Sequence, residues 1–160
     1  MERISKENYY LNIAQTVLER ATCLRRVFGA IIVKNDEIIS TGYNGAPRGR
    51  RNCVDMGLCT RAAMQVPRGE RYELCRSVHA EANAIISAAR RDMVGGTLYL
   101  VGRNAQTGEL LHDATSCAMC RRLVINAGLS KVVIRNTETE YSTVDVQDWV
   151  DLEDDVPDLR

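Results

Sequence analysis

Three side chains that bind zinc and one carboxylate follow one another in a short pattern. Glu81 stands two residues after His79, and Cys117 and Cys120 form a Cys-x-x-Cys pair further along. One imidazole and two thiolates leave the fourth position of a tetrahedral zinc open to water, whereas four protein ligands would close it. A carboxylate that does not bind the metal can then move the protons that water chemistry requires. The pattern therefore predicts a catalytic zinc site with Glu81 as its acid–base group.

Two helix starts are expected to hold these four residues. An alanine-rich helix is predicted over residues 80–90, with the histidine and the glutamate at its N-terminal end. The two cysteines open a second predicted helix, over residues 118–127, for which Ser116 is the expected N-cap. The positive ends of both helix dipoles would then favour thiolate at one metal. The alternative interpretation is a closed structural zinc knot or a histidine buried in the core.

The rest of the chain alternates between predicted helices and strands. An amphipathic helix with Ser5 as its N-cap is predicted first, and the next two β-branched runs are expected to form an antiparallel hairpin. Four strands are predicted, at residues 29–33, 37–43, 97–101 and 131–135. This order predicts an α/β fold with three layers, α/β/α, around a mixed central sheet.

Two segments between these elements lack a regular pattern. Residues 44–76 are rich in glycine, proline and arginine and are predicted to form a long loop with a short helix near residues 61–65. A loop of this length is usually functional or braced by a metal. Residues 102–115 are polar, with a predicted small hairpin at 106–109, and contain His112, which could approach the site but is more simply a surface histidine.

Length and composition narrow the class of protein. The 160 residues, 45% of them hydrophobic, suit a single domain over residues 1–160, with an acidic tail at about 145–160 that docks by Trp149. The net charge of zero argues against a stable nucleic-acid partner, which would need a basic face. No apolar run approaches the roughly 20 residues of a membrane span, and Met1–Lys6 lacks a signal-peptide core. A cytoplasmic location without membrane association is therefore expected.

Four cysteines lie outside the first pattern, namely Cys23, Cys53, Cys59 and Cys75. Thiols in a reducing compartment are poor candidates for disulfides. Four thiolates would instead make a closed tetrahedral zinc site, which could brace the long loop. The alternative is that they are small buried hydrophobic residues.

Several segments together identify a resemblance to a family. Over about residues 5–136 the chain resembles the deoxycytidylate (dCMP) deaminases of the cytidine deaminase superfamily. The matching segments are Gly-Ala-Ile-Ile-Val at 29–33, Gly-Tyr-Asn-Gly-Ala-Pro-Arg-Gly at 42–49, His-Ala-Glu-Ala-Asn-Ala-Ile at 79–85, Cys-Ala-Met-Cys at 117–120 and Ile-Asn-Ala-Gly at 125–128. The His-x-Glu and Cys-x-x-Cys elements are typical of zinc-dependent nucleobase deaminases in general, whereas residues 42–49 with Asn83 resemble the dCMP branch. Departures from the family are Ser116 in place of proline, Phe28, and the longer segment 102–115.

The resemblance implies a cytidine-deaminase-like fold and the hydrolytic deamination of dCMP to dUMP with release of ammonia, which would supply dUMP for thymidylate synthesis. It implies that Glu81 protonates N3 of the cytosine and carries a proton to the departing amine. Asn44 would hydrogen-bond the sugar, although Asn-Gly is also an ordinary left-handed turn. Arginine forks suit a 5′-phosphate. The candidates are Arg25, Arg26, Arg48 and Arg121, each of which could instead be a surface charge.

The resemblance also extends to assembly and regulation. It implies a homo-oligomer, a hexamer or smaller, with dCTP as activator, dTTP as inhibitor and Mg²⁺ as a candidate companion of such a triphosphate. Some bacterial and phage relatives carry a second, structural zinc. Two other functions stay open: a zinc deaminase of another cytosine or adenine substrate, either a free nucleoside or a nucleic-acid base, and a non-catalytic nucleotide-binding module. Glu81 argues against the module, because zinc does not need it and deamination does.

Overall fold

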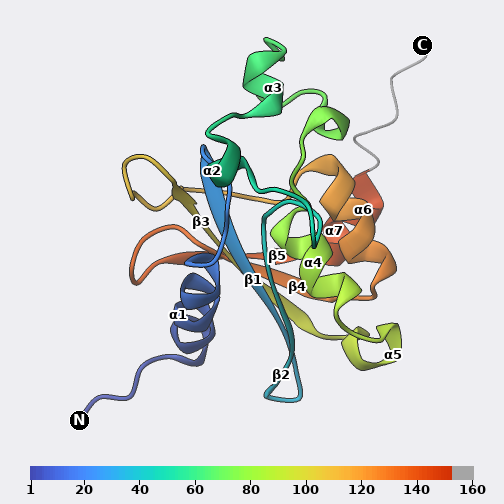
Figure 1. Ribbon diagram of the computed structural model, residues 1–160. Coiled ribbons are helices and arrows are strands. Elements are labelled where there is room, and N and C mark those ends of the chain that lie inside the picture. Colours follow the sequence, from blue (N-terminus) through green and yellow to red (C-terminus); the bar gives the residue numbers. More distant parts are fainter. Residues whose placement is uncertain (153–160) are drawn as a thin grey trace.

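Five strands form one mixed sheet in the order β2-β1-β3-β4-β5 (Figure 1). Neighbouring strands are antiparallel except β3 and β4, which are parallel. The strands are β1 Arg26–Lys34, β2 Glu37–Tyr43, β3 Thr97–Asn104, β4 Lys131–Arg135 and β5 Tyr141–Asp145. This computed structural model describes residues 1–152; residues 153–160, the end of the predicted acidic tail, lie outside the described part.

Helices cover both faces of the sheet, as Figure 1 shows. Helix α1 (Lys6–Leu18) packs its apolar side on one face, and four helices cover the other. These are α4 Ala80–Ile86, α5 Arg90–Met93, α6 Ala118–Asn126 and α7 Val146–Leu152. Alternate residues of β1 enter the two cores, Ile31 the core under α1 and Ile32 the core under α4 and α6. The predicted three-layer α/β/α arrangement with a mixed sheet is confirmed.

The local signals at the start of the chain are confirmed in detail. The Ser5 hydroxyl accepts a hydrogen bond from the amide of Asn8 at 3.2 Å, so it is the N-cap of α1. The first two strands form the predicted hairpin through Asn35 and Asp36, both of which have positive φ. Such a turn matches the twist of a hairpin. The small hairpin at residues 106–109 is also present, closed by hydrogen bonds from the backbone amide of Asn104 to Glu109 and of Gly108 to Asn104.

Several predicted boundaries differ from the structure. Strands β1 and β3 are longer than the strands predicted at residues 29–33 and 97–101. The helix expected over residues 80–90 ends at Ile86, where the Ser87 hydroxyl donates to the carbonyl oxygen of Asn83 at 2.8 Å, and a separate helix follows from Arg90. The segment expected to be an acidic tail from residue 145 begins with the last residue of β5 and continues as α7. The predicted docking by Trp149 is confirmed, because this side chain packs against the core. Strand β5 went unpredicted because it is a polar edge strand that pairs with β4 alone.

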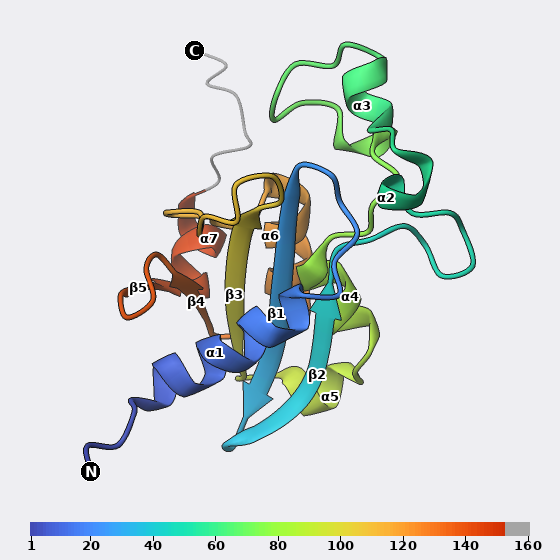
Figure 2. The same ribbon diagram turned by 60° about the vertical axis from the view of Figure 1, so that its left-hand side comes forward.

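The irregular segment 44–76 projects beyond the sheet as an arm (Figure 2). It contains the short helices α2 (Cys53–Met56) and α3 (Thr60–Ala63) and a 3₁₀ turn, η1 (Tyr72–Leu74). The short helix predicted near residues 61–65 is therefore present as α3. No helix within residues 1–152 combines the length and apolar character that crossing a membrane requires.

Two glycines allow helices to lie directly on the sheet. A Cβ at Gly29 would be 2.1 Å from the carbonyl oxygen of Ala14 in α1. A Cβ at Gly42 would be 2.3 Å from the carbonyl oxygen of Ala80 and 2.4 Å from the amide of Ala84, both in α4. Real Cβ atoms do not approach backbone this closely, so the depth at which α4 sits depends on the absence of a side chain at residue 42.

One contact between α1 and the hairpin turn predicts a response to alkaline pH. The Tyr10 hydroxyl donates to the Asp36 carboxylate, and this hydrogen bond, followed by burial, raises the pKa of Tyr10 to about 12. The unfolded chain would lose this proton near its ordinary pKa of about 10. Between about pH 10 and 12 the folded protein therefore binds more protons than the unfolded one, so its stability falls as pH rises. Tyr10→Phe is expected to lose less stability than the wild type over this range.

The measurement is the free energy of unfolding in urea at pH 8, 10 and 11.5 for both proteins. Groups that the two proteins share contribute equally, so the difference between the two pH profiles reports Tyr10. Profiles that stay parallel across the range would contradict the prediction.

Candidate active site

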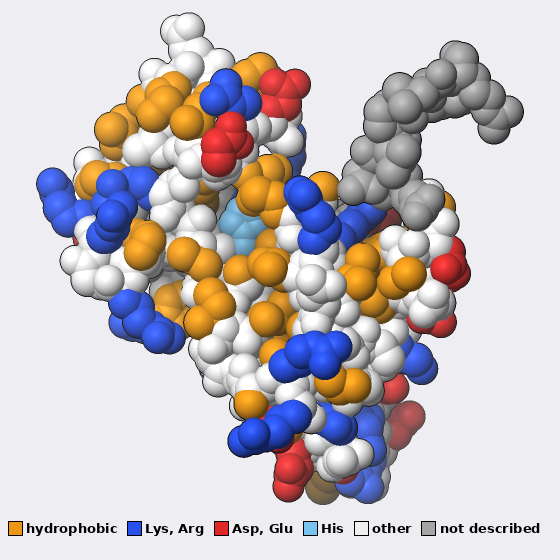
Figure 3. Space-filling model, turned by 90° about the vertical axis from the view of Figure 1, so that its right-hand side faces the viewer, with side chains coloured by type: hydrophobic (Ala, Val, Ile, Leu, Met, Phe, Trp, Pro, Cys, Tyr) orange, Lys and Arg blue, Asp and Glu red, His pale blue; other side chains and the backbone are white. Residues whose placement is uncertain are grey.

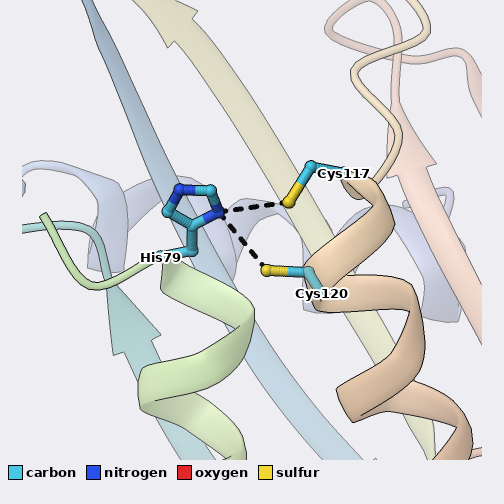
Figure 4. A group of neighbouring side chains, drawn as sticks. All are labelled: His79, Cys117 and Cys120. Atoms are coloured by element: carbon cyan, nitrogen blue, oxygen red, sulfur yellow. Dashed lines mark hydrogen bonds between the residues drawn. The ribbon is translucent and has the colours of Figure 1, made fainter. Parts of the chain in front are cut away.

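The site lies at one end of the sheet, where several elements begin or end. Strand pairing places the start of β1 beside the ends of β2 and β3, because Gly29 pairs with Tyr43 and Arg26 with Asn104. At this end, His79 is the N-cap residue of α4 and Cys117 that of α6. The N-termini of these two helices therefore lie close together at this end of the sheet (Figure 4), as the sequence analysis expects.

The imidazole and the two thiols form a compact triangle (Figure 4). The Nδ1 atom of His79 lies 3.5 Å from the Sγ of Cys117 and 3.3 Å from the Sγ of Cys120. All three donor atoms lie within 4.8 Å of one another. We call this group the metal triad.

The triad has the chemistry and spacing of a zinc site. A tetrahedral zinc with Zn–N near 2.0–2.1 Å and Zn–S near 2.3 Å separates its nitrogen and sulfur ligands by about 3.5 Å, which agrees with the two distances above. Both cysteines lie in the first turn of α6 or at its cap, where the helix dipole favours thiolate. Because three protein donors converge, a fourth coordination position would stay open.

Hydrogen bonds inside the triad shift its acid–base behaviour. The contact with the Cys120 thiol, with a further contribution from His79, holds the pKa of Cys117 well below its usual range. The same hydrogen bond, together with burial, raises the pKa of Cys120, and the contact with Cys117 raises the pKa of His79. The lowered pKa of Cys117 favours its thiolate, which is the form that binds zinc.

Glu81 lies next to the triad without belonging to it. Its side chain is only 5% exposed, it stands in the first turn of α4, and its charge acts on both Cys120 and His79. A buried carboxylate beside a metal position is suited to exchanging protons with a substrate held there. Glu81 also lines the cavity that contains His79 and Cys117.

A cavity of about 400 Å³ opens over the triad. In Figure 3 a histidine side chain is visible at the bottom of a hollow, with Lys and Arg side chains on the surface around it. The lining includes Phe28, Asn44, Tyr72 and Glu81 together with residues 111–115, which follow β3. Four arginines also line it, namely Arg25, Arg26, Arg61 and Arg68. The cavity can therefore hold a small molecule that carries negative charge at one end.

Comparison with known proteins places this site in a family. Residues 4–136 match the family described as the cytidine and deoxycytidylate deaminase zinc-binding region. The chain belongs to this family. As a member, it is a deaminase and therefore a hydrolase, and the zinc expected from its sequence is the metal of the family.

Individual relatives agree with the family match. The deoxycytidylate deaminase of Mycobacterium phage D29 is 34% identical over 138 residues, which cover 83% of this chain and 96% of the phage protein. That of Schizosaccharomyces pombe is 33% identical over 131 residues, 82% of this chain, but the chain spans only 37% of the yeast protein. A dCMP deaminase from cyanophage S-TIM5, solved in complex with dCMP and dUMP, matches with a TM-score of 0.55 and 25% identity over 84% of this chain and 85% of that chain.

Asn44 lines the deaminase cavity, but its amide is also a structural clamp. Its Oδ1 accepts from the amide of Phe28 at 2.8 Å, and its Nδ2 donates to the carbonyl oxygen of Arg26 at 2.9 Å. The alternative interpretation, a left-handed turn residue, is wrong because the φ of Asn44 is not positive. The clamp joins the end of β2 to the start of β1 and leaves one N–H and one lone pair of the amide for a ligand.

The four arginines proposed from the sequence divide into two pairs. Arg25 and Arg26 line the cavity, at the start of β1. Arg48 is exposed on the arm, and Arg121 donates from Nε to the Ser116 carbonyl oxygen and lies over the Trp149 ring, 5.2 Å from its centre; neither lines the cavity.

Three cavity residues were missed by the sequence analysis. Arg61, Arg68 and Tyr72 all come from the arm and line the cavity. Their only sequence signal was the density of arginine in a long loop, which does not say which arginine turns inward.

Two further expectations have mixed outcomes. Ser116 is not the N-cap of α6, because the chain stays extended for one more residue and Cys117 takes that position. The Ser116 hydroxyl is buried and has no hydrogen-bond partner among the described residues.

His112 does line the cavity, on its exposed side, where its Nδ1 lies 2.9 Å from the Asp113 carboxylate.

The four remaining cysteines lie in one region without forming a closed cluster. Cys53 is buried, and its pKa is raised by burial and by the three other cysteines. Two of the sulfurs accept hydrogen bonds from amides two residues later, Cys23 from Arg25 and Cys75 from Ser77, each at 3.4 Å. Within residues 1–152, however, no three of these four sulfurs lie within 4.8 Å of one another.

Proposed function

We propose that this chain is a zinc-dependent dCMP deaminase that hydrolyses dCMP to dUMP and ammonia. The observation that carries the proposal is that His79 and Cys117 of the metal triad, buried Glu81 and four arginines line one cavity. The metal triad and Glu81 are what deamination of a cytosine ring needs. The arginines match a substrate that carries a phosphate.

In this mechanism Glu81 moves the protons. Zinc, held by the triad, would act as a Lewis acid and lower the pKa of water, so that attack on C4 of the ring becomes possible at neutral pH. Glu81 accepts the proton released from water and gives it to N3 of the pyrimidine. It then takes the proton of the new hydroxyl on C4 and delivers it to the amine, which leaves as ammonia as the C4 carbonyl forms. Its burial keeps bulk water away from these transfers. Asn44, with its free N–H and lone pair, is placed to hydrogen-bond the sugar.

The 5′-phosphate is assigned to the arginines of the cavity. Arg25 and Arg26 precede and begin β1, and Arg61 and Arg68 come from the arm. The acidic lining residues are Glu81 and Asp113, so cationic side chains outnumber them. An uncharged nucleoside would not need this excess, which favours a monophosphate over free cytidine or deoxycytidine.

The test is ammonia release from dCMP, CMP, deoxycytidine and cytidine in parallel, with Arg26→Gln, Arg25→Gln and the arm variant Arg50→Gln as a matched control. A charge-assisted hydrogen bond to phosphate contributes about 1.5–3 kcal/mol, so each cavity variant should lower kcat/KM for dCMP by about 10- to 100-fold. Arg50, which does not line the cavity, should have little effect. Equal turnover of cytidine and dCMP would instead favour the nucleoside branch of the family.

Supply of dUMP, regulation and assembly form the finer part of the proposal. These proposals rest on the family resemblance. The dUMP produced would serve thymidylate synthesis, and dCTP would activate the enzyme while dTTP inhibits it, with Mg²⁺ bound beside the triphosphate. The chain would assemble into a homo-oligomer. Assays with each triphosphate, with and without Mg²⁺, test the regulation. The mass of the particle in solution by light scattering tests the assembly.

We also propose that Cys23, Cys53, Cys59 and Cys75 hold a second, structural zinc. The proposal is supported by the grouping of the four cysteines and by the amide-to-sulfur hydrogen bonds at Cys23 and Cys75, which are of the kind that thiolate ligands accept. Binding would draw the four sulfurs together and brace the arm. The wild type is then expected to contain about two zincs per chain and Cys53→Ser about one.

The measurement is elemental analysis of zinc together with thermal unfolding. Cys53→Ser should also unfold at a lower temperature, because a structural metal contributes its binding energy to folding. Since Cys75 and His79 belong to one short stretch of chain, loss of the structural zinc should weaken metal binding at the triad as well. A wild-type protein with one zinc per chain would exclude the second site.

A further inference from the structure

A buried arginine and a tyrosine of the arm lie in series with the histidine of the metal triad. The guanidinium carbon of Arg61 lies 4.5 Å from the centre of the Tyr72 ring. The Tyr72 ring in turn meets the His79 imidazole edge to face, with 5.4 Å between centres and an angle of 90°. All three side chains line the cavity. The arm therefore reaches the metal triad through one continuous stack of side chains.

The outer end of this stack is firmly held. Arg61 is only 8% exposed, and its Nη2 donates to the carbonyl oxygens of Glu70 at 2.6 Å and Pro67 at 3.4 Å. Next to it, the Thr60 hydroxyl donates to the carbonyl oxygen of Leu74 at 3.0 Å. These bonds fasten α3 to both sides of the turn in which Tyr72 stands, so the position of the tyrosine ring is set by the folded arm.

At the inner end of the stack, the Tyr72 ring contacts the imidazole ring of His79, whose orientation determines where its Nδ1 atom points. The Nδ1 atom of His79 faces both cysteine sulfurs, so rotation of the imidazole about its Cβ–Cγ bond would turn the nitrogen lone pair away from the metal. Histidine ligands depend on a neighbouring group that fixes the plane of the ring. The perpendicular contact with Tyr72 is a favoured aromatic geometry and opposes this rotation.

We propose that Tyr72, held in place by Arg61, is a positioning residue that fixes the imidazole plane of His79 for metal binding. It does so with its ring and not with its hydroxyl. The folding of the arm thereby becomes a condition for tight metal binding at the catalytic site. This inference rests on the proposed function in one respect, which is that His79 binds the metal.

The test replaces zinc by Co²⁺, whose visible spectrum reports ligand geometry independently of turnover. The bands that belong to the triad are those absent from Cys120→Ser. Titration followed at these bands should show that Tyr72→Leu binds Co²⁺ about 2- to 10-fold more weakly than the wild type, as expected for loss of an aromatic pair. The absorption maxima of these bands should also shift. Tyr72→Phe, which keeps the ring, should stay within about twofold of the wild type. Tyr141→Leu, on the edge strand β5, is the matched control and should leave the bands unchanged.

Arg61→Met provides a second route to the same ring if Tyr72→Leu folds poorly. It should shift the same bands in the same direction. The double variant should bind Co²⁺ about as weakly as the weaker of the two single variants, and not as weakly as their summed effects would give, because both act through one side chain. Bands and affinity that stay at wild-type values in folded Tyr72→Leu or Arg61→Met would overturn the inference. A wild-type protein with no Co²⁺ bands that depend on Cys120 would overturn the proposed metal role of the triad instead.

Discussion

Replacement of Glu81 by glutamine is expected to lower kcat for dCMP by about 10²- to 10⁴-fold while the zinc content stays at the wild-type level. Glutamine keeps the size and most of the hydrogen-bonding capacity of the side chain but cannot accept and return a proton. The carboxylate is buried beside the triad but is not one of its three donors. The Glu81→Gln variant should therefore lose proton transfer, measured as turnover, while it keeps metal binding, measured as zinc content.

The measurement is steady-state ammonia release together with zinc analysis of the same preparation. Glu109→Gln, on the exposed hairpin after β3, is the matched control and should behave as the wild type. A Glu81→Gln variant that keeps most of its activity would remove Glu81 from the mechanism. One that loses zinc as well as activity would mean that the carboxylate helps to hold the metal.

Replacement of Gly42 by alanine is expected to reduce both stability and activity. The new Cβ would lie 2.3 Å from a backbone oxygen and 2.4 Å from a backbone nitrogen of α4. Backbone atoms cannot avoid it by changing rotamer, so α4 must move outward, and such overpacking typically costs about 1–3 kcal/mol. Because α4 carries His79 and Glu81 at its start, a shift of about 1 Å could lower kcat/KM by about 10²-fold.

Gly29→Ala is an informative comparison for this variant. Its Cβ would press on α1, which lies on the opposite face of the sheet and carries none of the triad. It should lower the free energy of unfolding to a similar degree but leave the kcat of the folded fraction closer to the wild type. Urea unfolding and kinetics on both variants, with the outward-facing Thr41→Ala as a neutral control, make the distinction. If Gly42→Ala keeps wild-type kcat/KM, the depth of α4 does not set the geometry of the site.

The two halves of the active-site motif were predictable from the order and spacing of residues along the chain. His79 and Glu81 are two residues apart, and Cys117 and Cys120 are three apart, so each pair is placed by the first turn of its own helix. The first helix, the hairpin and the strands of the core were also predictable. Their apolar periodicity, N-cap and turn residues are local signals that the surrounding fold does not override.

The surroundings of the triad, in contrast, depend on how distant parts of the chain pack together. Arg26 and Arg48 are indistinguishable as sequence, yet one lines the cavity and the other is exposed on the arm. Asn44 was predicted to be a turn or a sugar ligand, but strand pairing makes it a clamp between β2 and β1. Tyr72 meets His79, and Arg61 lies over the Tyr72 ring, because the folded arm brings the three side chains together. These contacts join residues whose separation along the chain carries no periodic signal, so their geometry is set by how the sheet, the helices and the arm pack together.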